Sequence, residues 1–342
     1  MPKTNIVFLE TEKWEQDYIK EKLSSNRELS LNFCKKPLGK ISEKEMAVIK
    51  TADILAVFIY SIIDKIILEK LFRLKFIATM STGYDHIDLN TCKEKGIKVS
   101  NVPFYGDNTV AEHTFALILA FSRKLPQSFA KTRFGDFTLN DLRGFDLKGK
   151  TIGIIGLGHI GEWTARIAFG FGMKILAFDP KKQPKLSAKF GVKYTTLDYL
   201  LGNSDIITLH APYNEQTRHL INKNNIVKIK KGALLINTAR GGLVETEALL
   251  LALQKGILAG AGLDVLEEEC FIKEEKELLT KPFQKTCDLR TVLRNHLLIN
   301  NPKVLITPHN GFNSQEALLR ILDSTIENIK GFSKGKPINL VG

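Results

Sequence analysis

Residues 150–180 read KTIGIIGLGHIGEWTARIAFGFGMKILAFDP, and this stretch decides the fold of the domain that contains it. It opens with an apolar run at 151–155 that is short enough for a buried strand. Gly156, Gly158 and Gly161 follow in the G-x-G-x-x-G spacing, and then come a helix-length segment and a second apolar run. Strand, glycine turn, helix and strand in this order predict a βαβ unit that holds a dinucleotide.

Each part of this unit has a mechanical role. Gly156 permits the tight turn, Gly158 lets a pyrophosphate approach backbone N–H groups, and Gly161 lets the helix pack close to the sheet. The helix N-terminus offers partial positive charge to the phosphates. Asp179 ends the second strand, where a carboxylate can accept both ribose hydroxyls and would repel a 2′-phosphate. The pattern therefore favours NAD over NADP, whereas a glycine turn in an ordinary βαβ unit would leave Asp179 unexplained.

Length and composition indicate a soluble globular protein of two domains. The chain has 342 residues, 44% of them hydrophobic and 25% charged. Its first residues lack the pattern of a signal peptide, and no apolar run is long enough to span a bilayer. We therefore expect no membrane association.

The cysteines and the charge exclude other classes of protein. Cys34, Cys92, Cys270 and Cys287 are scattered without a C-x-x-C pair, so they predict reduced thiols in a cytoplasmic protein and no metal site. The net charge is +12, but the lysines are interleaved with acids and no nucleic-acid-binding motif accompanies them. We expect no nucleic-acid partner; a positive field would instead attract small anions.

Alternating strand and helix patterns run through the whole chain and predict an α/β fold with two doubly wound parallel-sheet domains. Residues 1–105 together with 311–342 form one predicted domain, and 106–310 form the dinucleotide domain. Predicted strands are 5–9, 54–60, 76–80 and 98–101 in the first domain, and 151–155, 175–178, 206–209, 233–237, 260–265 and 304–306 in the second. Predicted helices are 11–23, 62–71, 109–125, 198–201, 223–229, 245–254 and 314–329.

Ligands of such sheets bind just beyond the carboxyl ends of the strands. The residues at these ends in the second domain are His210-Ala211-Pro212, Thr238-Ala239-Arg240, Asp264 and Thr307-Pro308-His309. The helix at 109–125 is apolar on nearly every face, which predicts burial between domains or against another subunit. Its His113 is interpreted as a core residue, and His86 and His219 as loop or surface residues.

Several motifs in fixed order make the chain similar to the D-isomer-specific 2-hydroxyacid dehydrogenase family over essentially its full length. The matching stretches are STGYDHID (81–88), NTVAEH (108–113), GLGHIG (156–161), NTARGGLVE (237–245), AGLDVLEEE (261–269) and TPHNGF (307–312). The resemblance implies a Rossmann domain inserted in a flavodoxin-like substrate domain, NAD as cofactor and a homodimer.

The resemblance also implies three catalytic positions, Arg240, Glu269 and His309. Their chemistry suits the reduction of a 2-keto acid: histidine can give a proton near neutral pH, a carboxylate can orient it, and the arginine fork can hold the substrate carboxylate. Glu269 adjoins Glu267 and Glu268, so a register shift of one residue would favour a neighbour. Cys270 stands where many relatives have proline.

The remaining implied contacts fall on the predicted loops. Those to the cofactor are Gly156, Gly158, His159, Ile160, Gly161, Asp179, Ala211, Pro212, Thr217, Thr238, Ala239 and Asp264. Those to the substrate are the backbone amides of Thr82 and Gly83, together with Tyr105 and Arg240.

The predicted function is reduction of a small 2-keto acid by NADH to the D-2-hydroxy acid, with pyruvate and D-lactate as the first pair because Tyr105, the long insertion after Glu269 and Phe312 resemble the D-lactate dehydrogenases. Phosphoglycerate dehydrogenase and hydroxypyruvate or glyoxylate reductase are the enzyme alternatives. A non-catalytic NAD(H)-sensing regulator is a third hypothesis, and an intact Arg/Glu/His set argues against it.

Overall fold

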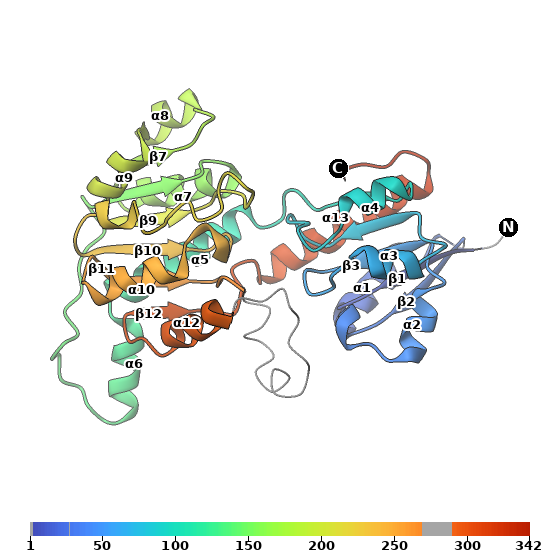
Figure 1. Ribbon diagram of the computed structural model, residues 1–342, viewed down its shortest axis with the longest axis horizontal. Coiled ribbons are helices and arrows are strands. Elements are labelled where there is room, and N and C mark those ends of the chain that lie inside the picture. The colour runs from blue at the N-terminus through green and yellow to red at the C-terminus, as the bar shows by residue number, and fades with distance from the viewer. Residues whose placement is uncertain (1–2, 27, 269–288) are drawn as a thin grey trace. The chain divides into compact units, whose positions relative to one another are not determined.

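The computed structural model describes residues 3–26, 28–268 and 289–342 (Figure 1). The chain divides into two compact units: unit 1 comprises Met1–Tyr105 and Ser314–Gly342, and unit 2 comprises Gly106–Asn313. Each unit contains a largely parallel sheet with helices packed on it, so the predicted α/β class with two parallel sheets is confirmed.

Unit 1 is built on a sheet of strand order β13-β5-β4-β3-β1-β2, in which only β13 is antiparallel to its neighbour among the described strands. The strands are β1 (Thr4–Phe8), β2 (Leu29–Phe33), β3 (Ile54–Val57), β4 (Phe76–Thr79), β5 (Lys98–Ser100) and β13 (Leu340–Val341). The helices are α1 (Lys13–Leu23), η1 (Leu38–Lys40), α2 (Glu43–Ile49), α3 (Lys65–Lys70), α4 (Leu89–Glu94) and α13 (Gln315–Ser333).

The last helix completes unit 1 although it comes from the end of the chain. Helix α13, red in Figure 1, packs on α1 and β4, and Phe332 stacks on Phe76 at 4.4 Å between ring centroids. Ser314 caps the helix by accepting a hydrogen bond from the Ala317 N–H. The predicted return of this segment to the first domain is therefore observed.

Unit 2 has a sheet of order β12-β11-β10-β9-β6-β7-β8, all of whose pairings are parallel in the described residues. The strand order reverses at β6, as in dinucleotide-binding sheets. The strands are β6 (Thr151–Ile155), β7 (Lys174–Phe178), β8 (Lys193–Tyr194), β9 (Ile206–Leu209), β10 (Ala233–Asn237), β11 (Leu258–Leu263) and β12 (Val304–Ile306).

Helices cover both faces of this sheet and bury a separate apolar cluster on each (Figure 1). One face carries α5 (Asp107–Ser122), α7 (His159–Gly170) and α8 (Pro184–Phe190). The other face carries α9 (Leu197–Asn203), η2 (Ile226–Lys228), α10 (Thr246–Gln254) and α12 (Leu289–Ile299). Two short elements complete the unit, α6 (Leu125–Arg133) and η3 (Gly241–Leu243).

The helix predicted at 223–229 shrinks to the three residues of η2. The Asn222 backbone N–H donates to the Asn225 side chain at 2.9 Å, and the Asn225 amide donates to the Leu220 carbonyl at 2.8 Å. These bonds between side chains and backbone stabilise a turn over residues 220–225, as asparagine often does. The opposite error occurs at α12, which forms within the long insertion after Glu269, where no helix was predicted.

In the part of the chain that the structure describes, no helix combines the length and apolarity needed to cross a membrane. The same residues contain no cluster of histidine, cysteine and acidic side chains arranged to hold a metal ion.

Candidate active site

The glycine turn after β6 has the geometry that its spacing predicts. Gly156 has φ +90°, and a Cβ atom there would lie 2.6 Å from the Ala211 nitrogen, so only glycine fits. A Cβ on Gly161 would collide with the Gly156 carbonyl oxygen. Gly158, in contrast, has no atom within 4 Å of its Cβ position. The first and third glycines are therefore required by packing, and the second leaves open space before the helix.

That space lies at the N-terminus of α7. Gly158 is the N-cap residue and makes no side-chain cap, and His159 and Ile160 form the first turn of the helix. The N–H groups of a first helical turn have no partner inside the helix, so they can bind an anion. These features fit the phosphates of a dinucleotide.

Asp179 lies beside this turn, directly after β7. One carboxylate oxygen accepts from the Leu157 N–H at 2.6 Å and the other from the Lys181 N–H at 2.7 Å. A carboxylate has about four acceptor positions, so each oxygen keeps capacity for a ribose hydroxyl. The hydrogen bonds fix the carboxylate at the edge of the glycine turn. Its contact with the ribose stays a prediction.

A histidine to which sequence reasoning gave no role supports the same turn. His210 follows β9, and its Nε2 atom lies 3.2 Å from the Thr164 hydroxyl on α7 and 3.1 Å from the Thr208 hydroxyl. Burial of the imidazole lowers the pKa of His210 to about 3, so the ring is neutral at physiological pH. Its place at a strand's carboxyl end was visible in the sequence, but its burial was not.

The other predicted cofactor positions have varied surroundings. Ala211 packs against Gly156, and the Thr217 hydroxyl donates to the Pro212 carbonyl at 2.6 Å, which closes the loop between them. The Thr238 side chain is buried, and its hydroxyl pairs with that of Thr114 at 2.9 Å. The Ala239 N–H donates to the Asn237 side chain at 3.1 Å. These bonds set the loop conformations around the turn.

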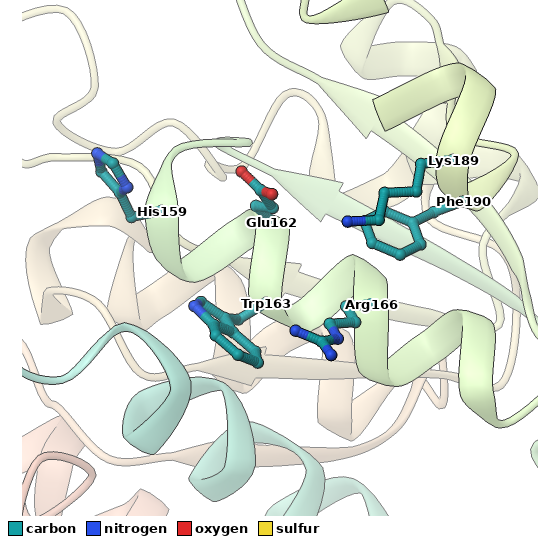
Figure 2. Close-up of a pocket in the computed structure, with 6 residues that line it drawn as sticks. All are labelled: His159, Glu162, Trp163, Arg166, Lys189 and Phe190. Carbon is teal, nitrogen blue, oxygen red and sulfur yellow. The ribbon is translucent and has the colours of Figure 1, made fainter. Parts of the chain in front are cut away.

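A separate polar pocket of about 220 Å³ runs along the outer face of α7 (Figure 2). His159, Glu162, Trp163 and Arg166 line it from α7, and Lys189 and Phe190 line it from α8. The Arg166 guanidinium lies 4.7 Å from the centre of the Trp163 ring. Of the residues predicted to contact cofactor, the pocket includes His159 alone.

Arg240 follows β10 by three residues. Its carbonyl accepts from the Asn237 side chain at 2.9 Å, and its Nη1 donates to the Ala239 carbonyl at 2.8 Å. The half-buried side chain is thus held at the carboxyl edge of the sheet by its own loop.

Asp264, directly after β11, anchors the segment that carries His309. Its carboxylate accepts from the Thr307 hydroxyl at 2.5 Å and from the Asn310 and Gly311 N–H groups at 3.0 and 2.8 Å. Its carbonyl accepts from the His309 N–H at 2.9 Å. His309 itself has φ +53°, an uncommon left-handed conformation that these bonds over-determine.

Asp264 is ionised in this network. Burial raises the pKa of its carboxyl group, but the bonds from His113, Thr307 and Gly311 outweigh that effect and bring the pKa below its ordinary value. The Asp264 carboxylate binds the Thr307 hydroxyl and two backbone N–H groups of the protein itself. Its predicted place near the nicotinamide stays a prediction.

The expectation that His113 is a core residue of its apolar helix is wrong, because its Nε2 lies 3.0 Å from the Thr307 hydroxyl and 3.4 Å from the Asp264 carboxylate. Residues at helical spacing on an apolar face give no sign of such a partner, which comes from a strand nearly two hundred residues later in the chain.

Glu269 lies outside the described residues, as does Cys270. Its neighbour Glu267 is described and is bound within the protein: the carboxylate contacts the His219 imidazole at 2.5 Å and accepts from the Thr246 hydroxyl at 2.7 Å. Glu267 is therefore engaged within the protein. The neighbour that a one-residue shift from Glu269 would favour is Glu268.

The predicted substrate residues of unit 1 lie on two loops of that unit. The Thr82 hydroxyl donates to the Val102 carbonyl at 2.8 Å, and the Ser81 hydroxyl donates to the Gly83 carbonyl at 2.6 Å. Within the described residues, the backbone N–H groups of Thr82 and Gly83 have no intramolecular acceptor. The Tyr105 carbonyl accepts from Arg320 of α13 at 2.6 Å.

A half-buried acid at the same edge of the unit 1 sheet had no predicted role. Glu10 follows β1 with φ +58° and contacts the Ser61 hydroxyl. Burial raises the pKa of Glu10 to about 7, although bonds from Ser61 and the Tyr60 N–H oppose the rise.

Comparison with known proteins matches this geometry to one family. Residues 115–311 match the profile described as "D-isomer specific 2-hydroxyacid dehydrogenase, NAD binding domain". A D-lactate dehydrogenase of Curvularia clavata is 35% identical over 92% of this chain and 87% of its own length. A glyoxylate reductase of Thermococcus litoralis is 35% identical over 89% of this chain and 87% of its own length.

Solved structures agree. The crystal structure of D-lactate dehydrogenase from Aquifex aeolicus, complexed with NAD and lactic acid, superposes with a TM-score of 0.87 at 37% identity. The match covers 98% of this chain and 99% of that one.

Proposed function

The chain belongs to the D-isomer specific 2-hydroxyacid dehydrogenases, an NAD-dependent enzyme family, and from this premise we propose that it reduces a small 2-keto acid to the D-2-hydroxy acid, with pyruvate as the first candidate. Relatives named D-lactate dehydrogenase support pyruvate, and the relative named glyoxylate reductase supports glyoxylate as the alternative.

One observation carries the proposal: Arg240 and His309 follow strands on either side of β11, and Asp264 joins them. The Asp264 N–H donates to the Asn237 carbonyl at 2.9 Å, three residues before Arg240, and the Asp264 carbonyl accepts from the His309 N–H at 2.9 Å. The arginine and the histidine thus project from one sheet edge on loops that share an anchor. A guanidinium and an imidazole at one edge are the groups that reduction of a 2-keto acid requires.

The residues would divide the work as follows. When bound, NADH would supply the hydride that the carbonyl carbon receives. His309 would give a proton to the carbonyl oxygen, the role of general acid that histidine most often fills in enzymes. Arg240 binds the substrate carboxylate with its planar fork. Glu269 remains our candidate for the carboxylate that orients His309.

The cofactor assignment follows from the turn at Gly156. The space over Gly158 and the α7 N-terminus fits a pyrophosphate, and Asp179 fits the adenosine ribose. The fixed carboxylate supports NAD over NADP, because a 2′-phosphate would meet a like charge.

For unit 1 we propose that the amides of Thr82 and Gly83 bind a carboxylate group and that Tyr105 borders the substrate. Two adjacent N–H groups in a turn form a small anion-binding surface.

We also propose that the protein acts as a cytoplasmic homodimer. Cys34 and Cys92 are buried free thiols, which supports a reducing compartment. Support for the dimer comes from the exposed aromatic residues Phe129, Phe134 and Phe137 of unit 2.

The test is turnover of NADH with pyruvate, glyoxylate, hydroxypyruvate, phenylpyruvate and 3-phosphohydroxypyruvate, followed by absorbance. We expect the largest kcat/KM for an unphosphorylated keto acid. His309→Gln should reduce kcat by about 10²- to 10⁴-fold and leave NADH binding unchanged. No oxidation of NADH with any of these acids would refute the proposal.

A further inference from the structure

The carboxylate of Glu267 connects three segments at the carboxyl edge of the unit 2 sheet: two loops and the first turn of α10. One oxygen contacts the His219 imidazole, on the loop after β9, at 2.5 Å. The other accepts from both the hydroxyl and the N–H of Thr246, at 2.7 and 3.2 Å, in the first turn of α10. Glu267 itself lies on the loop after β11. The side chains of Glu267 and His219 are only 17% and 27% exposed, so water screens their pairing weakly.

Backbone bonds tighten the same region. The His219 N–H donates to the Gly242 carbonyl at 2.8 Å, and the Asn295 side chain of α12 donates to the Glu267 carbonyl at 2.5 Å. Glu267 is therefore held at both its carboxylate and its carbonyl group. His219 has φ +50°, a conformation that costs energy and that these bonds maintain.

The backbone of Leu266 and Glu267 packs directly against Gly241, the residue after Arg240. A Cβ on Gly241 would overlap the backbone of Leu266 and the nitrogen of Glu267, so the two loops touch without space for a methyl group. Arg240 itself is held by Asn237, whose side-chain amide donates to the Arg240 carbonyl at 2.9 Å. The position of Arg240 is thus set by Asn237 before it and by the Leu266–Glu267 backbone after it.

We propose that Glu267 and His219 are a positioning pair that fixes the loop of Arg240 for binding the substrate carboxylate. The inference rests on the proposed function, since it concerns the same arginine, but it gives two residues roles that the reaction chemistry does not assign. The first acid of the Glu267–Glu269 run thereby acts through Arg240 and does not exchange protons with substrate.

The experiment compares Glu267→Ala, Glu267→Gln, His219→Ala and the double alanine variant in the full chain. Two quantities are measured: kcat and KM with pyruvate, and the affinity of the protein–NADH complex for oxamate, from NADH fluorescence. Displacement of an orienting group by about 1 Å can cost about 10²-fold. We expect Glu267→Ala to lower kcat/KM and oxamate affinity by about 10- to 100-fold, with NADH affinity changed less than about threefold, because the phosphate and ribose positions at Gly158 and Asp179 lie on other loops.

Conservative replacement should rescue the effect. The Gln carbonyl can still accept from Thr246 and its amide can still meet His219, so Glu267→Gln should lie within about threefold of the wild type, a difference below 1 kcal/mol. His219→Ala should add little to Glu267→Ala, because each removes the same contact. The matched control is Glu247→Ala. Glu247 lies in the same turn of α10 as Thr246, and its exposed carboxylate pairs with Lys223 and Arg294.

The outcomes separate this inference from the proposed function. Unchanged oxamate affinity in Glu267→Ala, or parallel loss of oxamate and NADH binding, would overturn the positioning role. Wild-type protein that binds oxamate without oxidising NADH would refute the proposed function and leave the oxamate comparison valid. Wild-type protein that does neither would overturn both.

Discussion

Asp179 is a single residue whose charge should decide between two cofactors. Asp179→Gly should raise the KM for NADH about tenfold and bring NADPH closer to NADH in kcat/KM, because the variant loses the ribose acceptor and the repulsion of a 2′-phosphate. Steady-state kinetics with both cofactors measures this change.

The control for this prediction is Asp205→Gly. Asp205 also binds a backbone amide, accepting from the Thr151 N–H at 2.9 Å, but it precedes β9 and lies at the opposite end of the strands. It should alter stability without altering cofactor preference. Equal NADH preference in wild type and Asp179→Gly would contradict the ribose assignment.

His210 should make stability depend on pH in a defined direction. Its pKa is about 3 in the folded protein, against 6.5 for an unperturbed histidine side chain. Between pH 6.5 and pH 3, the imidazole therefore binds a proton in the unfolded chain and stays neutral in the folded one. The free energy of unfolding should therefore fall as pH decreases from 6.5 towards 3, by up to about 1.4 kcal/mol per pH unit from this group.

Urea unfolding of wild type and His210→Gln at pH 7 and pH 5 tests this. The variant should be less stable at pH 7 and should lose less stability between the two values. Identical pH slopes for the two proteins would show that His210 can be protonated in the folded state.

At the scale of elements, the β6–turn–α7 unit assigns different roles to its glycines. Gly156→Ala should destabilise the fold, since the residue has φ +90° and its Cβ would lie 2.6 Å from the Ala211 nitrogen. Gly158→Ala has open space for its Cβ, so its melting temperature should stay near that of wild type while NADH affinity falls at least tenfold.

Thermal melting and NADH fluorescence titration on the two variants separate these effects. If Gly158→Ala bound NADH as tightly as wild type, the space above that residue would not be the phosphate site. The pair thus distinguishes a glycine needed for the fold from one needed for the ligand.

At the scale of the whole molecule, unit 2 exposes several large apolar residues within one short segment, as a surface that contacts a second copy would. Phe129, Phe134, Phe137 and Leu139 lie on α6 and the segment after it, with side chains that are 66%, 91%, 79% and 83% exposed. Helix α5 is different, because Phe115, Leu117 and Ile118 are buried in the core of unit 2 itself. The segment after α5 is therefore the better candidate for a contact with a second copy.

Light scattering should give twice 38.4 kDa for the wild type. A Phe134→Ser/Phe137→Ser variant should shift towards the monomer, since it loses apolar area that only a partner would bury. Phe72→Ser is the matched control, because Phe72 is 89% exposed on unit 1. A monomeric wild type, or a variant that stays dimeric, would contradict this interface.

The sequence by itself determined the local chemistry of this protein. The glycine spacing predicted the turn at Gly156, and the polar residues after each strand predicted where Arg240, Asp264 and His309 would lie. Such features are readable because strand and helix periods, and the conformational freedom of glycine, are properties of short stretches of chain.

Only the tertiary structure decided which distant groups meet. It placed His113 on Asp264, buried His210 against α7 and joined His219 to Glu267. Each of these contacts joins segments that are far apart in sequence or depends on burial by several elements. No periodicity within one segment records them, because they arise when the parallel strands bring their carboxyl ends to a common edge.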